Sequence, residues 1–173
     1  MSITMNNKGK ILFGLLVHDH PGVMMKITGM FARRGFNIAS ITVGASERPG
    51  LSRITIMAEG DEETMEQINK QLNKLVDVLK VKIFRQDSTV REMALVKVNV
   101  IKNRDRQEII TLIDIFRGKV IDVTTKTMTL EIVGTSKKVD SFIHLIDDIV
   151  QIREISRSGV IAMARGEESI SLG

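Results

Sequence analysis

The chain has 173 residues, 43% hydrophobic and 27% charged, which is typical of soluble globular proteins. Its net charge is +4, from 25 basic and 21 acidic residues interspersed along the chain, whereas nucleic-acid binders usually gather Lys and Arg on one face. The absence of cysteine excludes disulfides and thiolate metal sites. No apolar run approaches the roughly 18 residues that span a bilayer. Residues 1–10 lack a signal-peptide pattern, so we expect a cytoplasmic protein.

The first predicted elements are a buried strand and an amphipathic helix. Residues 10–17 (KILFGLLV) form a continuous apolar run of strand length. Residues 21–34 carry apolar side chains at helical spacing, and Gly35 follows where helices commonly end in a left-handed residue. The apolar face of this predicted helix consists of Val23, Ile27, Met30 and Phe31.

Four further elements complete the first half of the chain. Residues 36–45 and 51–58 favour strands and are separated by a turn that contains Pro and Gly. Asp61 is the expected N-cap of a second amphipathic helix over 61–75. Residues 77–84 form the last strand of this half. The resulting β-α-β-β-α-β order is that of the ferredoxin-like fold.

The second half repeats this order after a polar segment at 85–91, which we take as the domain boundary. A strand at 93–101 and a helix at 104–116 precede two strands, a helix and a strand at 150–156. The sequence therefore predicts an α+β protein with two ferredoxin-like β-α-β-β-α-β domains in tandem.

The C-terminal end predicts an additional strand at 159–164 and a frayed tail at 165–173. Each half has about 80 residues, a size that buries only about 60–65% of the unfolded surface. An antiparallel sheet with helices on one face also leaves its other face and its edges open. We therefore expect the sister domain or a second copy of the chain to cover them, which predicts a homo-oligomer.

We expect no catalytic residues in this chain. It has no Cys nucleophile, no Ser in a G-x-S-x-G turn, and neither of the common glycine-rich phosphate-binding motifs. A metal site would depend on His18 and His20, whose side chains point the same way in an extended chain. A stable site needs three or four ligands, and the remaining histidine, His144, lies in the other half. We therefore also expect no metal site.

The segment after the first strand favours binding of a small anionic group. Pro21 is suited to the first turn of a helix, with Asp19 or His20 as its N-cap. The N–H groups of Gly22 and Val23 would then lack intrahelical partners, and the helix dipole would place partial positive charge on them. A ligand carboxylate would be stabilised there.

Asn37 begins the strand expected across from this loop. Its amide, with the carboxylate of Asp19, would bind the ammonium of an amino acid, while Val23 and Ile38 would contact its side chain. The alternative is that the loop merely caps a helix and Asn37 merely starts a strand. The residues alone leave both interpretations open.

An ordered series of motifs resembles the small regulatory subunits of acetolactate synthase (acetohydroxyacid synthase). The series runs through HPGVMMKITGMFARRGFNIASITVG, GLSRITIMAEG, REMALVKV, IFRGKVIDV, GTSKKVDSFI and EISRSGVIAMARG, and it covers roughly residues 10–166. The resemblance implies an amino-acid-sensing ACT domain at 10–85 and a second, ACT-like domain at 92–165.

The resemblance also implies a non-catalytic subunit that pairs through its ACT domains and binds valine at their interface. It would activate a separate large catalytic subunit and confer feedback inhibition on it, in branched-chain amino-acid biosynthesis. Thiamine diphosphate, Mg²⁺ and FAD would belong to that partner, and this chain would hold no cofactor. The implied effector-binding residues are Asp19, His20, Gly22, Val23, Asn37 and Ile38.

One of these residues departs from the family pattern, because the position of Asp19 is commonly Asn. A carboxylate would favour the effector's ammonium and oppose its carboxylate, unless Asp19 serves as the helix cap. The competing classes are an ACT-type amino-acid or metal sensor with another partner, and an RNA-binding module with the same element order. The RNA-binding module would need aromatic residues on its third strand, and residues 51–59 contain none.

Overall fold

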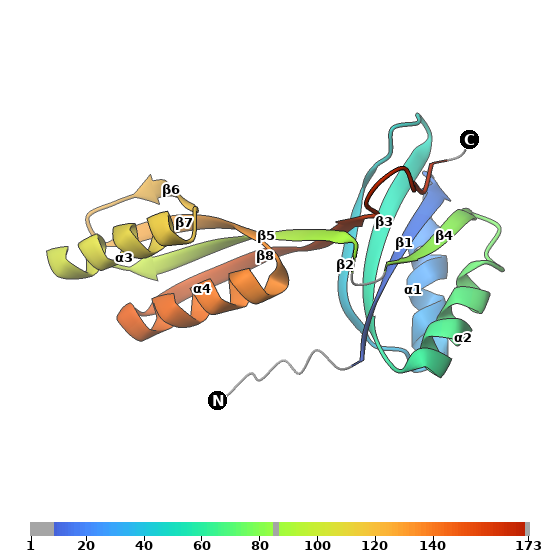
Figure 1. The fold of residues 1–173 in the computed structure, drawn as a ribbon, viewed down its shortest axis with the longest axis horizontal. Helices are drawn as coiled ribbons and strands as arrows, with labels where there is room; N and C mark the ends of the chain where they lie inside the picture. The colour runs from blue at the N-terminus through green and yellow to red at the C-terminus, as the bar shows by residue number, and fades with distance from the viewer. Residues whose placement is uncertain (1–8, 85–86, 172–173) are drawn as a thin grey trace. The chain divides into compact units, whose positions relative to one another are not determined.

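The structure is a computed structural model that describes residues 9–84 and 87–171 (Figure 1). Two sequence-based expectations fall partly on residues outside these ranges: the missing signal peptide, at 1–8, and the start of the domain boundary, at 85–86. The described residues divide into two compact units, one formed by 9–84, 87–89 and 162–171 and the other by 90–161. The C-terminal end of the chain thus belongs to the same unit as its N-terminal half.

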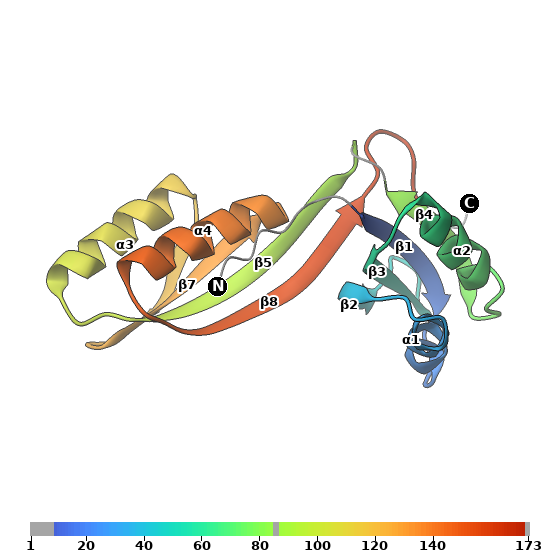
Figure 2. The ribbon, with the colours of Figure 1, turned by 90° about the horizontal axis from the view of Figure 1, so that it is seen from below.

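The first unit is a four-stranded antiparallel sheet in the order β2-β3-β1-β4. Two helices lie on the same face of this sheet (Figure 2). The elements are β1 (Lys10–His18), α1 (Val23–Arg33), β2 (Ile38–Ala45), β3 (Leu51–Glu59), α2 (Glu62–Leu72) and β4 (Val78–Phe84).

Alternation along β1 separates the two faces of the sheet. Phe13, Leu15 and Val17 are buried against the helices, because successive strand residues point to opposite faces. The helix faces that meet them are the predicted ones. Four α1 side chains are buried there, Val23, Ile27, Met30 and Phe31.

The caps of the two helices of this unit agree with the sequence-based expectations, with one exception. Asp61 accepts a hydrogen bond from the Thr64 amide, which confirms it as the cap of α2. Gly35 follows α1 with φ of 68°, as predicted. The cap of α1, however, is Gly22 at φ of 92°, with no side-chain hydrogen bond. The expectation that Asp19 or His20 caps this helix is therefore wrong.

The second unit has the equivalent sheet order, β6-β7-β5-β8, and its two helices also share one face (Figure 2). The predicted tandem of ferredoxin-like domains is thus confirmed. The separate strand expected at 159–164 is wrong, since β8 runs on without a break through Gly159. The elements are β5 (Thr89–Asn99), α3 (Asn103–Ile115), β6 (Lys119–Val123), β7 (Thr127–Gly134), α4 (Ser136–Ile149) and β8 (Ile152–Met163).

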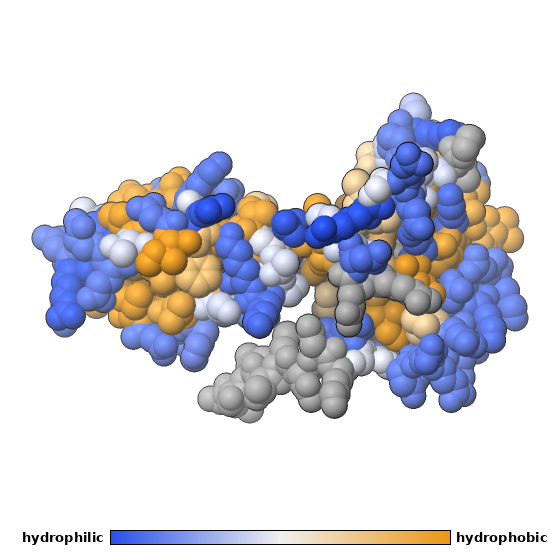
Figure 3. Space-filling view, viewed as in Figure 1, coloured by the Kyte–Doolittle hydropathy of each residue, from blue (hydrophilic) through white to orange (hydrophobic). Residues whose placement is uncertain are grey.

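The second unit leaves apolar side chains on its surface. Figure 3 shows them interspersed with polar residues. Ile115, at the end of α3, is 70% exposed, and Val123, at the end of the edge strand β6, is 53% exposed. Single exposed apolar side chains of this kind are common on protein surfaces. In the part of the chain that the structure describes, no helix is long and apolar enough to cross a membrane.

The C-terminal segment packs on the first unit, so the expected fraying is wrong for the described residues up to 171. Ile170 is only 4% exposed. It lies over Gly14 of β1, where an added Cβ would come within 2.5 Å of the Ile170 Cδ1 and 2.6 Å of a Phe84 ring carbon. Glycine at position 14 therefore makes the space that Ile170 fills.

Three basic side chains of the same sheet hold this segment by polar contacts. Arg53 on β3 donates to the Ala162 carbonyl at 3.1 Å. On β4, Lys80 donates to the Ser171 carbonyl at 3.0 Å, and Lys82 pairs with Glu168 at 2.5 Å. The sheet face opposite the helices is thus covered in part by the chain's own C-terminal end rather than by a second copy.

Candidate effector site

The loop between β1 and α1 is anchored at both neighbouring strands. The His18 amide donates to the Asp77 carbonyl at 3.0 Å, just before β4. The Asp19 amide donates to the Gly50 carbonyl at 2.8 Å, in the turn that leads into β3. The loop is therefore fixed relative to the sheet by its backbone before any side chain contributes.

Gly22 gives this loop its sharp entry into α1. Its φ of 92° is in the region that favours glycine, and an added Cβ would meet no atom within 4 Å. The Val23 amide makes only a long hydrogen bond of 3.4 Å, to the His20 carbonyl. The helix therefore presents its partially positive N-terminus beside an exposed glycine, which suits an approaching carboxylate.

His20 and Asp77 form a charged cluster with α1. The Nε2 of His20 lies 2.8 Å from the Asp77 Oδ1, and its Nδ1 lies 3.0 Å from the Pro21 carbonyl. Lys26 of α1 donates to the Asp77 Oδ2 at 2.7 Å. Hydrogen bonds from Lys26 and then His20 lower the pKa of Asp77. The Pro21 carbonyl, followed by Asp77, raises the pKa of His20 above its ordinary 6.5.

This cluster bears on the metal interpretation of the two loop histidines. Both ring nitrogens of His20 already face oxygen acceptors. Across residues 9–84 and 87–171, no group of three or more His, Cys, Asp or Glu side chains is placed to hold an ion. The arrangement instead anchors a loop.

Asn37 and Ile38 lie at the other end of the same sheet. Ile38 pairs with Ala58, whereas His18 pairs with Leu51 at the opposite end of β3. Eight residue steps along β3, from 51 to 59, correspond to about 26 Å at 3.3 Å per residue. Within one chain the structure therefore does not bring Asn37 next to the loop at 19–22.

The surroundings of Asn37 include a carboxylate that sequence reasoning missed. The Asn37 Nδ2 donates to the Glu59 Oε2 at 2.8 Å, and the Glu59 amide donates to the Asn37 carbonyl. This pairing fixes the amide orientation, so Oδ1 is the atom that accepts from a ligand. The only sequence signal for Glu59 is its place directly after an apolar strand.

The two apolar residues of the predicted site contribute mainly to the core. Val23 is 4% exposed among the buried side chains of the first unit, so only its backbone faces the loop. Ile38 is half-buried and packs against the same core. Asp77 was also missed, because its contact with His20 joins residues 57 positions apart and leaves no local pattern.

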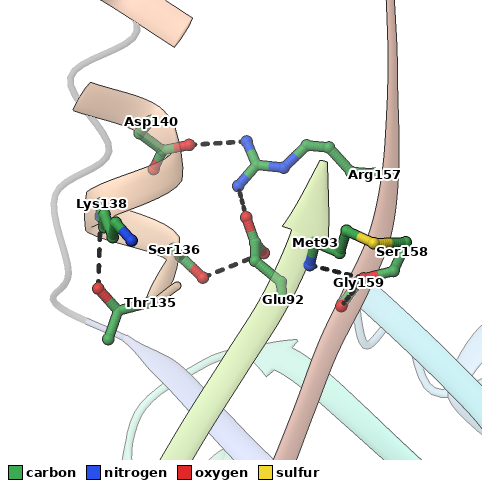
Figure 4. A network of polar contacts seen from close by, with 9 residues as sticks. All are labelled: Glu92, Met93, Thr135, Ser136, Lys138, Asp140, Arg157, Ser158 and Gly159. Carbon is green, nitrogen blue, oxygen red and sulfur yellow. Dashed lines mark hydrogen bonds and ion pairs between the residues drawn. The ribbon is translucent and has the colours of Figure 1, made fainter. Parts of the chain in front are cut away.

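The second unit carries its own buried charged cluster, shown in Figure 4. Glu92 of β5 is 6% exposed and pairs with Arg157 of β8, which also contacts Asp140 of α4 at 2.6 Å. Ser136, at the start of α4, donates to the other Glu92 oxygen at 3.2 Å. Each charged group has a partner, so the cluster joins α4 to the sheet and offers no free acid or base.

Two family models match successive parts of the chain. Residues 13–80 match an acetohydroxyacid synthase (AHAS) small subunit-like ACT domain, and residues 91–166 match the small subunit of acetolactate synthase. Together with the β-α-β-β-α-β fold, the first match defines the protein as one with an ACT domain.

Individual relatives share this organisation along nearly their whole length. The chain is 46% identical to the probable acetolactate synthase small subunit of Methanothermobacter thermautotrophicus, over 92% of this chain and 95% of that protein. It is 42% identical to the isozyme 3 small subunit of Escherichia coli, over 91% and 96%. The crystal structure of the Thermotoga maritima small subunit superposes with a TM-score of 0.84 at 50% identity, covering 92% and 99%. The chain therefore belongs to the acetolactate synthase small subunit family.

Proposed function

We propose that this chain is the non-catalytic regulatory subunit of an acetolactate synthase. It activates a separate large catalytic subunit and confers feedback inhibition by valine, in the cytoplasmic synthesis of branched-chain amino acids. Thiamine diphosphate, Mg²⁺ and FAD belong to the partner, and this chain needs none. The relatives named as small subunits support the role.

One observation supports an effector site shared between two copies: the predicted residues lie at opposite ends of one sheet edge. The loop at 19–22 contacts the turn that follows β2, through the Gly50 carbonyl, while Asn37 directly precedes β2. β2 is the edge strand of the described sheet. In a two-fold pair with antiparallel β2 strands, the start of one strand lies beside the end of the other. The loop of one copy then meets Asn37 of the partner subunit.

Such a shared site has the chemistry of an amino-acid binding pocket. The N-terminal amides of α1 take the α-carboxylate, since they carry partial positive charge. The Asp19 carboxylate takes the ammonium, together with Oδ1 of the partner subunit's Asn37. Glu59 lies beside Asn37 and adds a second negative charge at that end. The anion-binding part therefore comes from the loop of one copy, and the cation-binding part combines Asp19 of that loop with residues of the second copy.

Regulation follows from where this site lies. Valine bound across two copies favours the packing of the pair that holds it best. If that packing keeps the large subunit in a less active state, valine inhibits the enzyme. The strength of this coupling is set by the difference between the affinities of valine for the two packings of the pair.

The experiment is a calorimetric titration of the purified chain with valine, leucine, isoleucine and serine. The absence of Trp and Tyr makes heat a better signal than intrinsic fluorescence. We expect valine to bind the wild type and not Gly22→Asp, which places a negative side chain beside the carboxylate. Gly166→Asp is the matched control, because Gly166 also has positive φ and open space around it. If no amino acid binds, the effector role is refuted, and activation of the large subunit is then tested separately.

A further inference from the structure

Asp77 contacts the effector loop and α1 with three different oxygens. Its carbonyl accepts from the His18 amide at 3.0 Å, its Oδ1 from His20 at 2.8 Å, and its Oδ2 from Lys26 at 2.7 Å. The residue is 8% exposed and directly precedes β4, so the sheet holds it in place. One residue thus contacts the residue before the loop, a residue within the loop and the first turn of the helix.

His20 transmits this anchoring to the amide that faces the effector. Its Nδ1 donates to the Pro21 carbonyl, which shares a planar peptide unit with the Gly22 N–H. A hydrogen bond on that carbonyl therefore orients the Gly22 N–H. Because Nδ1 and Nε2 both face acceptors, and neutral imidazole has a single N–H, only the imidazolium form donates to both.

We propose that Asp77 is a positioning residue for the effector site, which holds protonated His20 against the Pro21–Gly22 peptide and makes effector affinity depend on pH. This inference rests on the proposed function and adds a means of regulation to the same site. The imidazolium also places a positive charge close to the effector carboxylate. Deprotonation removes that charge and one of the two hydrogen bonds.

The charged groups that face the imidazole agree in sign with this account. Asp77, from the start of β4, stabilises the imidazolium, and Lys26 from α1 opposes it more weakly. The net result is a pKa of His20 above 6.5. Because this pKa is raised, the imidazolium of His20 keeps both hydrogen bonds below about pH 6.5. It loses one of them as the pH rises through the pKa of His20 in the folded chain. Affinity is therefore expected to fall toward alkaline pH.

The first test needs no effector. NMR titration follows the ring protons of His18, His20 and His144, which are assigned with His→Gln variants. We expect the pKa of His20 to lie above 6.5 in the wild type and to fall in Asp77→Asn. The control is Glu108→Gln, which removes an exposed pair with Arg104. A pKa of His20 that Asp77→Asn leaves unchanged would overturn the inference.

The second test repeats the valine titration at pH 6 and pH 8.5. Wild-type affinity should fall about tenfold, the change expected for loss of one hydrogen bond to a charged group. Asp77→Asn should bind weakly at pH 6 and show little change with pH. His20→Gln keeps the Asp77–Lys26 pair and should also lose the pH dependence, so the test does not depend on Asp77→Asn folding well.

The two tests separate this inference from the proposed function. A wild-type chain that binds valine equally at both pH values would overturn the inference and leave the proposed function intact. A chain that binds no amino acid would refute the effector role itself. The NMR titration would then still decide whether Asp77 holds His20 as an imidazolium.

Discussion

The packing of the C-terminal segment is best tested by Ile170→Ala. Ile170 is 4% exposed and fills the space above Gly14. The substitution removes three carbons beyond Cβ, which at about 0.8 kcal/mol for each buried group amounts to about 2.4 kcal/mol. The segment lies at the surface and is able to settle into the space left behind. The additional cavity cost should therefore be small.

The lost packing free energy favours local detachment of the C-terminal segment more than it favours unfolding of the whole unit. At about 1.4 kcal/mol per tenfold, a loss of 2.4 kcal/mol raises the detached population about 50-fold. The effect on the whole unit is limited to the docking free energy of the segment, because the core around Phe13 and Ile27 does not include it.

Native-state proteolysis measures the detached population. Trypsin cleavage after Arg165, followed by mass spectrometry, should speed up by up to about 50-fold in Ile170→Ala, since such cleavage tracks the open form when reclosing is fast. Ile161→Ala is the matched control, because it removes the same atoms from a side chain that is 56% exposed. Equal cleavage rates for the two variants would refute the docked arrangement.

Three further changes have defined outcomes. Gly14→Ala places a methyl group where Ile170 lies, so tryptic cleavage of the C-terminal segment should rise and the melting temperature should fall. Arg157→Met leaves the buried Glu92 carboxylate with only the Ser136 hydroxyl, and urea unfolding should show a loss of about 3 kcal/mol. Glu92→Ala should lose less, because Arg157 is partly exposed and keeps the Asp140 carboxylate. Asp19→Asn should leave the melting temperature nearly unchanged, because Asp19 caps no helix, and should change valine affinity in calorimetry.

Periodicity predicted the core because buried faces recur with the spacing of the element that carries them. Val23, Ile27 and Phe31 follow helical spacing, and all three are buried in the structure. The cap of α2 was equally predictable, since the Asp61 carboxylate bonds an amide only three positions away. Local signals of this kind are complete within a short window of sequence.

Two of the misplaced features depend on contacts between distant parts of the chain. His20 resembles a helix cap, yet its ring turns to Asp77, and the left-handed Gly22 makes a side-chain cap unnecessary. The C-terminal segment is polar enough to predict fraying, yet Ile170 meets a glycine more than 150 positions earlier in the sequence. No local pattern encodes either pairing.

The candidate site shows the same limit. The sequence indicated which residues suit an amino acid, but their distance apart follows from the strand register. Because Ile38 pairs with Ala58 and His18 with Leu51, the two parts of the site separate along β3. The proposed site, shared between two copies, would follow from that register and from two-fold symmetry.

Mixing two inactive variants tests the shared site most directly. Gly22→Asp disables the loop and Asn37→Ala disables the amide, so neither variant alone should bind valine. If the two chains are unfolded and refolded together, half of the pairs are mixed and each mixed pair keeps one intact site. Calorimetry should then recover about a quarter of the wild-type valine sites. No recovery, from a mixture shown to contain mixed pairs, would mean that each site lies within a single chain and would contradict the account.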